Sequence, residues 1–524
     1  MPFLCAFYLL INFVNGDWYT EELKITRLAP GNLMAEFRFR IASDNLDLGP
    51  EYSLFPRIFA ELINAHSISE ISFLLTQGRW YSSRWGLPPQ PNGPTGASIH
   101  AWLRGNETHV DTKWRTLINS LNGLLCTAMT RVVPEQTSSP RLAFRRTGSS
   151  TEPMVHLRYS AVGKETICTE NMTPWKKLLP CKQVCITSFI SWFFVKLCSV
   201  LLFSANGLQC NWLLDLVVNT VFDIPLKTGK LDWNFSELFN REITGVCNAA
   251  SSSKVIVKLN EKNLHLIPKP TEIVGESYAV YDLQKIPSVR AFSVHGLYNH
   301  MFDSTSRQGN GSIRSTVKQL NVSSSISGTD QQSAVLISIL KNEGTSQDII
   351  YTHQLPWFLL IYYHTLSLTC RYLTDRPEQV VESPILHKHY FVPSLARKRP
   401  ALLELQFELP GDSECRVQLE FEKAFLRIRE YPPDANHGMY IPGAVVTLLG
   451  SNNTSIWKHQ DQAANTEMST CESLFFCDPV VLHGNVLLIT LPVPDFSMPF
   501  NVICFVMTTV SLCFGPIHGF STKM

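Results

Sequence analysis

The chain has little net charge and lacks the short motifs that mark common catalytic and nucleotide sites. Its 45 basic and 44 acidic residues leave a net charge of +1 over 524 residues. Because nucleic-acid binding depends on a basic excess, no nucleic-acid partner is expected. The sequence contains no GxSxG, HExxH, GxxxxGK[ST] or GxGxxG. It therefore predicts no cofactor and no metal site.

Two weaker catalytic hypotheses remain. His437 follows Asp434 by three residues in "PPDANHGMY". The pair is either a base with its orienting carboxylate or, as this Pro/Asn/Gly turn favours, a capped loop. Cys168 can act as a nucleophile only if folding brings a histidine to it, and an oxidising compartment favours a disulfide instead. The residues alone therefore favour a capped loop and a disulfide over catalysis at these two positions.

The two ends predict a membrane protein. Residues 1–16 begin with an apolar run and end in "NG", which is typical of a secretory signal peptide, although no basic leader precedes it. Residues 498–520 hold no charged side chain over 23 positions, enough for a helix to cross a bilayer core of ~30 Å. The alternative is a buried core helix. With 521–524 as a short cytoplasmic tail, the chain would be a type I membrane protein with its body in the lumen.

Sequons and cysteines support a lumenal body. Of the 14 cysteines, Cys5 lies in the predicted signal and Cys504 and Cys513 lie in the predicted span, so an odd number remains for disulfides. At least one of these is then free or bonded outside the chain. The sequons Asn452 and Asn453 overlap, so only one of them is expected to be used. The glycosylation candidates are Asn106, Asn171, Asn234, Asn310, Asn321 and Asn452.

A second apolar stretch, residues 185–210, resembles a membrane helix in composition. Lys196 interrupts it near the middle, and a charge at that depth costs ~2.5–3.5 kcal/mol on insertion. We therefore favour a buried or irregular segment of the lumenal body over a second span.

Most of the body has the period-two pattern of half-buried antiparallel strands. "LELQFEL" (403–409) and "RVQLEF" (416–421) alternate apolar and polar residues, and "PGDSEC" (410–415) between them predicts a hairpin-like turn. Residues 24–41 predict another strand pair. Helical spacing appears at 54–66 and 113–129. The predicted fold is mainly β: antiparallel, sandwich-like lumenal layers with a few covering helices and one C-terminal transmembrane helix.

The body divides into an N-terminal β-rich lobe with helices, 17–260, and a C-terminal sandwich-like lobe, 261–497. Segment 134–153 is rich in Ser and Pro, and segment 307–333 is rich in Ser, which predicts surface or disordered insertions.

Four separated blocks of the sequence are distinctive: "LTQGRWYSSRWG" (75–86), "CTENMTPWKKLLPC" (168–181), "YPPDANHGMYIP" (431–442) and "LPVPDFSMPFNVIC" (491–504). Together they closely resemble the PIG-T family, a non-catalytic subunit of the glycosylphosphatidylinositol (GPI) transamidase of the endoplasmic reticulum. Their order along the chain is that of the family. Stretch 185–210 is more apolar than this family leads one to expect.

The resemblance implies a mechanism and a set of partners. GPI transamidase removes a C-terminal signal from a precursor protein and joins the new carboxyl end to the ethanolamine phosphate of a GPI lipid. The nucleophilic cysteine belongs to a caspase-like subunit, PIG-K. The chain resembling PIG-T would be a scaffold in the endoplasmic reticulum membrane that clasps this enzyme and helps assemble the other membrane subunits.

Individual residues are carried over from the resemblance. It implies that Cys168 forms the disulfide to the catalytic subunit, while Cys181 closes an internal bridge with Cys210 or Cys247 as candidates. It also implies a GPI contact, to which Asp would offer charge and Asn and Ser would offer hydrogen bonds. For Asp495 and Ser497 the alternative is capping of the membrane helix. The implied GPI-lipid residues are Asn436, Asp495, Ser497 and Asn501.

Two rival functions fit parts of the sequence. A stand-alone type I adhesion or receptor ectodomain would also be β-rich, glycosylated and disulfide-bonded, but it would tolerate Cys168→Ser. A thiol hydrolase using Cys168 would cleave peptides without a partner.

Overall fold

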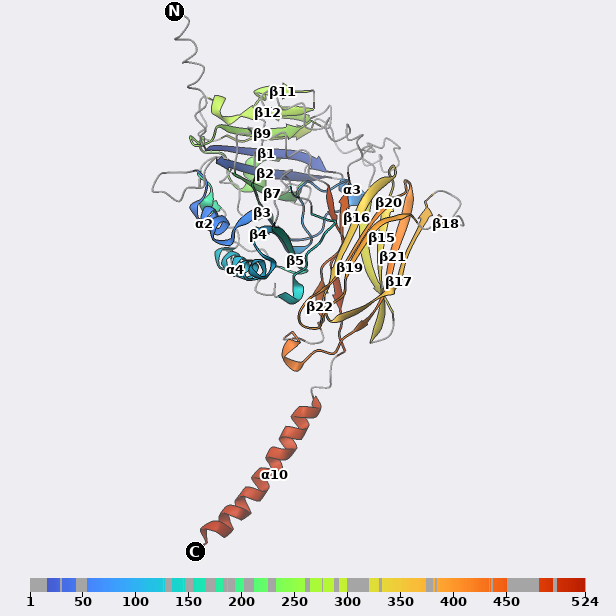
Figure 1. The fold of residues 1–524 in the computed structure, drawn as a ribbon. Coiled ribbons are helices and arrows are strands. Elements are labelled where there is room, and N and C mark those ends of the chain that lie inside the picture. The colour runs from blue at the N-terminus through green and yellow to red at the C-terminus, as the bar shows by residue number, and fades with distance from the viewer. Residues whose placement is uncertain are drawn as a thin grey trace, which may run out of the picture.

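The structure, a computed structural model, consists of two β-rich lobes and one projecting helix (Figure 1). The predicted signal peptide lies outside the described residues. Those residues are 17–28, 31–43, 54–125, 127, 134–144, 146, 154–165, 176–181, 186, 194–201, 212–224, 232–259, 264–275, 277–286, 292–298, 320–328, 332–373, 380–381, 384–432, 434, 437–449, 480–492 and 497–523.

A ten-stranded sheet forms the first lobe, in the order β11-β12-β9-β1-β2-β7-β6-β3-β4-β5. β1 and β9 pair in parallel, and the other neighbours in this sheet pair antiparallel. The predicted strand pair at 24–41 is confirmed as β1 and β2, with Gly31 in the left-handed region at φ +79° in their turn. The strands are β1 Trp18–Leu28, β2 Asn32–Ser43, β3 Ile68–Thr76, β4 Gly96–Arg104, β5 Val155–Val162, β6 Phe194–Leu201, β7 Trp212–Asp223, β9 Ser252–Lys258, β11 Glu272–Val274 and β12 Tyr278–Asp282.

The apolar stretch 185–210 contributes a strand of this sheet. Its described part, β6, lies between β3 and β7, and Lys196 is in register with Leu74 on one side and Val217 on the other. An apolar run is expected of a strand in the middle of a sheet, so the composition of this stretch does not require a membrane span. The prediction of a body segment over a second span is confirmed for these residues.

Two helices cover one face of the first lobe, as the helical spacing predicted (Figure 1). α2 (Arg57–His66) packs on β3, while α4 (Glu107–Leu125) packs on α2, β4 and β5. α4 begins six residues before the predicted segment 113–129 and ends four residues before its end. The short helix α7 (Phe235–Phe239) and the small sheet of β8 (Trp233–Asn234), β10 (Leu264–Ile267) and β13 (His295–Tyr298) complete this lobe, while the short helix α3 (Ser82–Trp85) contacts the second lobe.

The second lobe is a sandwich of two five-stranded sheets, so the predicted fold class is confirmed. Their orders are β14-β15-β21-β17-β18 and β19-β20-β16-β23-β24, and β22 pairs with β25 beside them. Side chains from both sheets form one apolar core. The strands are β14 Leu320–Ser327, β15 Ser333–Asn342, β16 Gln347–Leu355, β17 Leu359–Tyr372, β18 Val380–Val381, β19 Leu386–Val392, β20 Ala401–Leu409, β21 Ser413–Lys423, β22 Met439–Ile441, β23 Val445–Leu448, β24 Val481–His483 and β25 Leu487–Ile489.

The predicted hairpin at 403–421 is wrong in its pairing. β20 and β21 are both alternating strands, but β20 pairs with β16 and β19, and β21 pairs with β15 and β17. The turn between them, with Asp412 at φ +45°, carries the chain from one sheet to the other. Alternation of apolar and polar residues shows that each strand buries one face, but it does not show which strands pair. Here β20 and β21 bury their apolar faces in one core from opposite sheets.

The insertion predicted at 307–333 is wrong where the structure describes it. Residues 320–327 form β14, which pairs with β15 along its whole length. Leu320, Val322 and Ser324 face inward, so the period-two pattern persists beneath a serine-rich composition.

Two separate apolar cores mark the lobes. The first core extends to Val294 and the second begins at Leu320. We therefore propose that the lobe boundary lies between these residues, later than the position at 260 derived from sequence.

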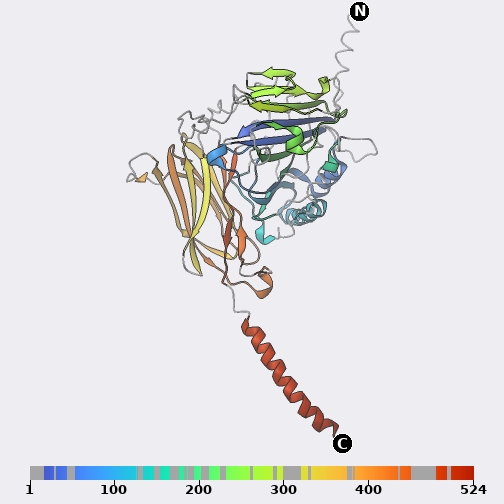
Figure 2. The same ribbon diagram turned by 180° about the vertical axis from the view of Figure 1, so that it is seen from behind.

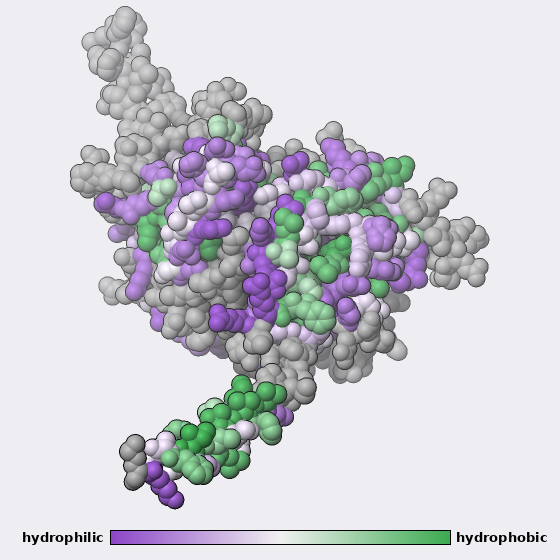
Figure 3. All heavy atoms as spheres, turned by 60° about the horizontal axis from the view of Figure 1, so that its bottom comes forward, coloured by the Kyte–Doolittle hydropathy of each residue, from purple (hydrophilic) through white to green (hydrophobic). Residues whose placement is uncertain are grey.

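The predicted membrane span is a single helix that leaves the body. α10 (Ser497–Thr522) projects from the second lobe in both views (Figure 1 and Figure 2), and the apolar window of its segment Phe500–Thr522 has no buried residue. Figure 3 shows this apolar cylinder below a body of mixed polarity. Among the described helices it is the one long and apolar enough to cross a membrane. An exposed apolar helix of this length is typical of a membrane anchor.

Candidate functional site at the junction of the lobes

Several predicted site residues lie outside the described residues: Cys168, Asn171, Asn310, Asn436, Asn452, Asn453 and Asp495. Ser497 is the first residue of α10, and Asn501 is exposed on it. The structure describes residues on either side of Cys168, Asn436 and Asp495, and contacts join some of these flanks where the lobes meet.

The Asn436 segment is tied on both sides to the strand that leads to the membrane helix. After it, β22 pairs with β25, with Met439 opposite Ile489. Before it, the hydroxyl of Tyr431 donates to the carbonyl oxygen of Pro492 at 2.5 Å. Pro492 precedes α10 by five residues, so two of the four resemblance blocks form one unit at the membrane end of the second lobe.

The described residues before Cys168, Gly163 and Lys164, approach the same unit from the first lobe. Lys164, which follows β5, places Nζ 3.5 Å from the hydroxyl of Tyr440 and 5.1 Å from the centre of its ring. Gly163 lies so close that an added Cβ would be 3.1 Å from the Cβ of Tyr440 and from Cγ1 of Val486. A contact between the lobes therefore stands four residues before Cys168.

The described side-chain contact of His437 is with Tyr440 of this junction, and its bond to Asp434 is made by the backbone. Its Nε2 is 3.1 Å from the Tyr440 hydroxyl, and its backbone N–H donates to the Asp434 carbonyl at 3.3 Å. The backbone bond is the capped turn that the Pro/Asn/Gly composition favoured. Lys164, His437 and Tyr440 together present polar hydrogens and one positive charge on the surface, which suits an anionic ligand.

A buried chain of hydrogen bonds supports this loop from within the sandwich. The hydroxyls of Ser338 and Tyr351 are 2.8 Å apart, and the Tyr351 hydroxyl is 3.0 Å from Nδ1 of His353. Nε2 of His353 is 3.2 Å from the carbonyl oxygen of Pro442. Burial lowers the pKa of His353 to about 4, with the Pro442 carbonyl opposing this shift, and burial raises the pKa of Tyr351. Both groups therefore stay neutral near pH 7.

The segment predicted as a surface linker at 134–153 is instead packed between the lobes in its first part. Ser138 and Ala143 are buried, and Ser138 donates its hydroxyl hydrogen to Oε1 of Gln354 in the second lobe at 2.7 Å. Trp357 donates Nε1–H to Glu135 at 3.1 Å. The composition resembles a linker because the stretch is irregular, but the backbone groups of Ser138 and the carbonyl oxygen of Gln136 have hydrogen-bond partners.

Disulfides stabilise both lobes. Cys181 bonds Cys247, one of the two partners left open by sequence, and Cys370 bonds Cys415 between β17 and β21. Since Cys181 has a partner inside the chain, it does not compete with Cys168 for an external one.

Three of the predicted sequons are described. Asn106 is exposed before α4, and its Oδ1 accepts from the N–H of Glu107 at 2.8 Å. Asn234 caps α7 by accepting from the N–H of Glu237 at 2.6 Å. Asn321 is half-buried on β14. Glycosylation at these positions stays a prediction.

Comparison with known proteins gives a family. Residues 3–190 and 204–524 match the family described as "Gpi16 subunit, GPI transamidase component". The chain belongs to the Gpi16 family. The GPI-anchor transamidase component PIGT of Mus musculus is 31% identical over 97% of this chain and 90% of its own length. The human PIGT component is 30% identical over the same shares, and GPI16 of Saccharomyces cerevisiae is 27% identical over 96% of this chain and 88% of its own.

The match to the Gpi16 family confirms the resemblance and covers all four blocks. The family match omits residues 191–203, an interval inside the apolar stretch that departs from the family pattern. This interval contains all of β6. Sequence reasoning missed Lys164, Tyr440 and His353, because their roles depend on contacts between distant segments. For Lys164, the sequence signal that could have found it is its position four residues before the block 168–181.

Proposed function

We propose that this member of the Gpi16 family is the scaffold subunit of a GPI transamidase. It clasps the caspase-like catalytic subunit through a disulfide at Cys168 and contributes to GPI lipid binding during attachment of the anchor. It supplies no catalytic residue of its own. It is a single-pass type I protein of the endoplasmic reticulum membrane whose body is lumenal.

One observation carries this proposal: the lobe junction joins three segments with separate predicted roles. Lys164 precedes the Cys168 loop, Tyr440 follows Asn436, and the β22–β25 pair leads into α10. A scaffold that holds an enzyme to the membrane, and receives a lipid there, needs these elements in one place.

The chemistry of the junction suits a phosphate-bearing glycolipid headgroup. Lys164 supplies a cation, while His437 and Tyr440 supply ring N–H and hydroxyl groups for phosphate or sugar oxygens. Asp495, with Asn436, Ser497 and Asn501, would meet the ammonium and hydroxyl groups of the same headgroup. Acyl chains would then remain beside α10 in the bilayer. The further partners are the other membrane subunits and precursor proteins with C-terminal GPI signals.

The lipid role is tested by Asp495→Ala expressed in cells that lack the endogenous subunit. The variant should lower the surface level of a GPI-anchored reporter severalfold, while co-purification of the other subunits is unchanged. Asp348→Ala is the matched control, because Asp348 is a half-exposed carboxylate on β16 outside the junction. Full reporter display with Asp495→Ala would remove this residue from the lipid site. Transport of the chain to the cell surface without partners would favour the adhesion ectodomain instead.

A further inference from the structure

Glu404, on β20, is a carboxylate with no exposed surface that accepts hydrogen bonds from three consecutive backbone amides. The N–H of Arg141 lies 2.7 Å from Oε2, and the N–H of Ala143 lies 3.0 Å from Oε1. The N–H of Leu142 is 3.2 Å from both oxygens, and the Thr352 hydroxyl is 3.4 Å from Oε1. Successive amides that converge in this way form a concave site for an anion. Here the anion comes from the other lobe.

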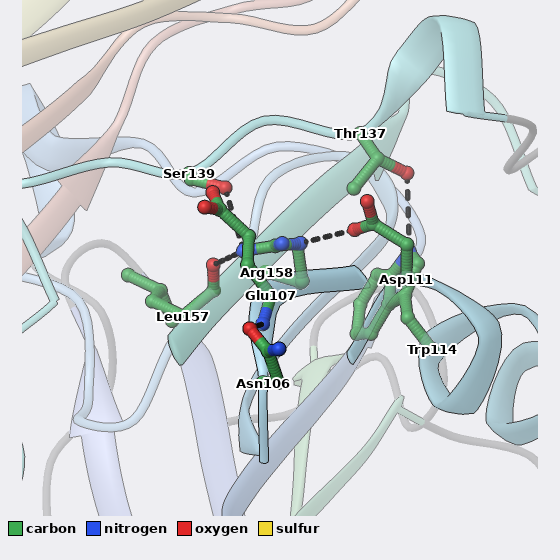
Figure 4. A network of polar contacts seen from close by, with 8 residues as sticks. All are labelled: Asn106, Glu107, Asp111, Trp114, Thr137, Ser139, Leu157 and Arg158. Atoms are coloured by element: carbon green, nitrogen blue, oxygen red, sulfur yellow. Dashed lines mark hydrogen bonds and ion pairs between the residues drawn. The ribbon is translucent and has the colours of Figure 1, made fainter. Parts of the chain in front are cut away.

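The segment that offers these amides is fixed to the first lobe. Ser138 forms a two-way backbone bridge with Tyr159 of β5 at 2.9 Å. Trp114 of α4 donates Nε1–H to the Thr137 hydroxyl at 3.1 Å, and Arg158 of β5 donates to the Ser139 hydroxyl at 3.0 Å. Figure 4 shows the last two contacts, with Asp111 of α4 on the other side of the Arg158 guanidinium. Residues 135–143, named here the latch segment, therefore belong to the first lobe and bind the second.

Burial makes this bond conditional on docking of the lobes. A carboxylate removed from water is costly unless its oxygens are fully hydrogen-bonded. On an undocked second lobe, Glu404 would be hydrated on the outer face of β20. In the docked state the amides of the latch segment replace that water. A rotation of the lobes that withdraws the three amides would leave the Glu404 charge buried without hydrogen-bond donors. This one side chain therefore discriminates strongly among lobe orientations.

The buried bond between Ser138 and Gln354 belongs to the latch segment, whereas two contacts outside that segment are more tolerant. Gln90 exchanges hydrogen bonds with the backbone of Val481 at 3.2 and 3.4 Å, and Lys164 reaches Tyr440 with a flexible side chain. Both pairs are half-exposed or exposed, so water can replace either partner at small cost.

We propose that Glu404 is the positioning residue that sets the orientation of the two lobes, through the amides of the latch segment. By this route it holds Lys164, four residues before Cys168, against Tyr440 at the membrane end of the second lobe. The relevance to transamidation rests on the proposed function, whereas the latch itself does not.

The test uses the full chain within its native complex in detergent and compares Glu404→Gln, Glu404→Asp and Glu408→Gln. Gln keeps the shape of Glu404 but removes the charge and turns an NH₂ group toward the amides. Asp keeps the charge on a shorter side chain. Glu408→Gln is the matched control, because Glu408 lies on the same strand and is exposed. The first readout is hydrogen exchange of the amides of residues 141–143.

Glu404→Gln should raise exchange of these amides at least tenfold and leave the amides between β15 and β21 unchanged. Glu404→Asp should restore part of the protection, and Glu408→Gln should match the wild type. Unchanged protection in Glu404→Gln would overturn the proposal. A uniform rise throughout both lobes would also overturn it, since that outcome reports general destabilisation.

A second readout reports orientation at a distance. A p-benzoylphenylalanine photocrosslinker at position 440 should capture the peptide that contains Gly163 and Lys164 in the wild-type background. Capture should fall severalfold with Glu404→Gln and recover in part with Glu404→Asp. Equal capture in all backgrounds would show that Glu404 does not set the orientation. Neither readout requires transamidase activity, so failure of the latch and failure of the proposed function are distinguishable.

Discussion

Nε2 of His353 donates a hydrogen bond to the Pro442 carbonyl at 3.2 Å, and this bond fixes the direction of a whole buried chain. A carbonyl only accepts, so Nε2 carries the hydrogen and neutral His353 must accept at Nδ1. The Tyr351 hydroxyl then donates to Nδ1, and the Ser338 hydroxyl donates to Tyr351. If His353 were protonated, Nδ1 would also carry a hydrogen and could not accept from the Tyr351 hydroxyl. The chain of hydrogen bonds is therefore intact only while His353 is neutral.

Stability should therefore depend on pH through His353. Its pKa is about 4 in the folded protein because of burial, and about 6.5 when unfolded. Between these values the unfolded chain binds the extra proton, so stability rises with pH across this window and is complete above about 6.5. We expect a loss of roughly 3 kcal/mol as pH falls from 6.5 to 4. Urea unfolding at a series of pH values measures it.

His353→Gln should lower stability at pH 7, because Tyr351 and Pro442 lose their partner, and should abolish this part of the pH dependence. His437→Gln, an exposed histidine at the surface end of the same loop, should retain it. If wild type and His353→Gln lose stability in parallel between pH 6.5 and 4, the pH dependence belongs to other groups.

Loss of the Cys181–Cys247 bridge should be costly, because it closes a loop of 66 residues that contains β6 and β7. The chain-entropy estimate for a loop of this length is about 4 kcal/mol. Cys181→Ser with Cys247→Ser should lower the denaturation midpoint accordingly. Cys513→Ser, an exposed free thiol on α10, should leave the midpoint unchanged. Equal midpoints for the double variant and the wild type would mean that the bridge adds little to the folded lobe.

The close approach at Gly163 predicts a lobe-specific defect. A Cβ there would stand 3.1 Å from Tyr440, so Gly163→Ala should destabilise by about 1–3 kcal/mol and weaken the contact between Lys164 and Tyr440. Gly123→Ala on α4 is the opposite case: a Cβ there meets nothing within 4 Å, and a helix interior favours Ala by about 1 kcal/mol. Thermal unfolding of the two variants should therefore shift in opposite directions. A neutral Gly163→Ala would mean that the junction adjusts freely.

The sequence predicted elements well where one local signal decided the outcome. Alternation located β1, β2, β20 and β21, helical spacing located α2 and α4, and an uncharged run located α10. It could not decide which strands pair, because β20 and β21 bury their apolar faces in one core from opposite sheets. Serine-rich composition concealed β14, whose inward positions still alternate.

The site was harder to predict because its parts come from distant segments. Glu404 stands in an alternating strand where polar residues normally face water, and only the latch segment, more than 250 residues earlier, makes that face an interior one. The same holds for Lys164 and Tyr440, separated by 276 positions. Local patterns carry no information about contacts at such separations.

Non-reducing electrophoresis of the complex, purified from endoplasmic reticulum membranes through this chain, tests the scaffold proposal most directly. The proposal predicts a band heavier than the chain by one caspase-like subunit, which is absent after reduction and absent in Cys168→Ser. Cys513→Ser should retain it. A wild-type chain that migrates as a monomer, or a heavier band that persists in Cys168→Ser, would contradict the covalent clasp.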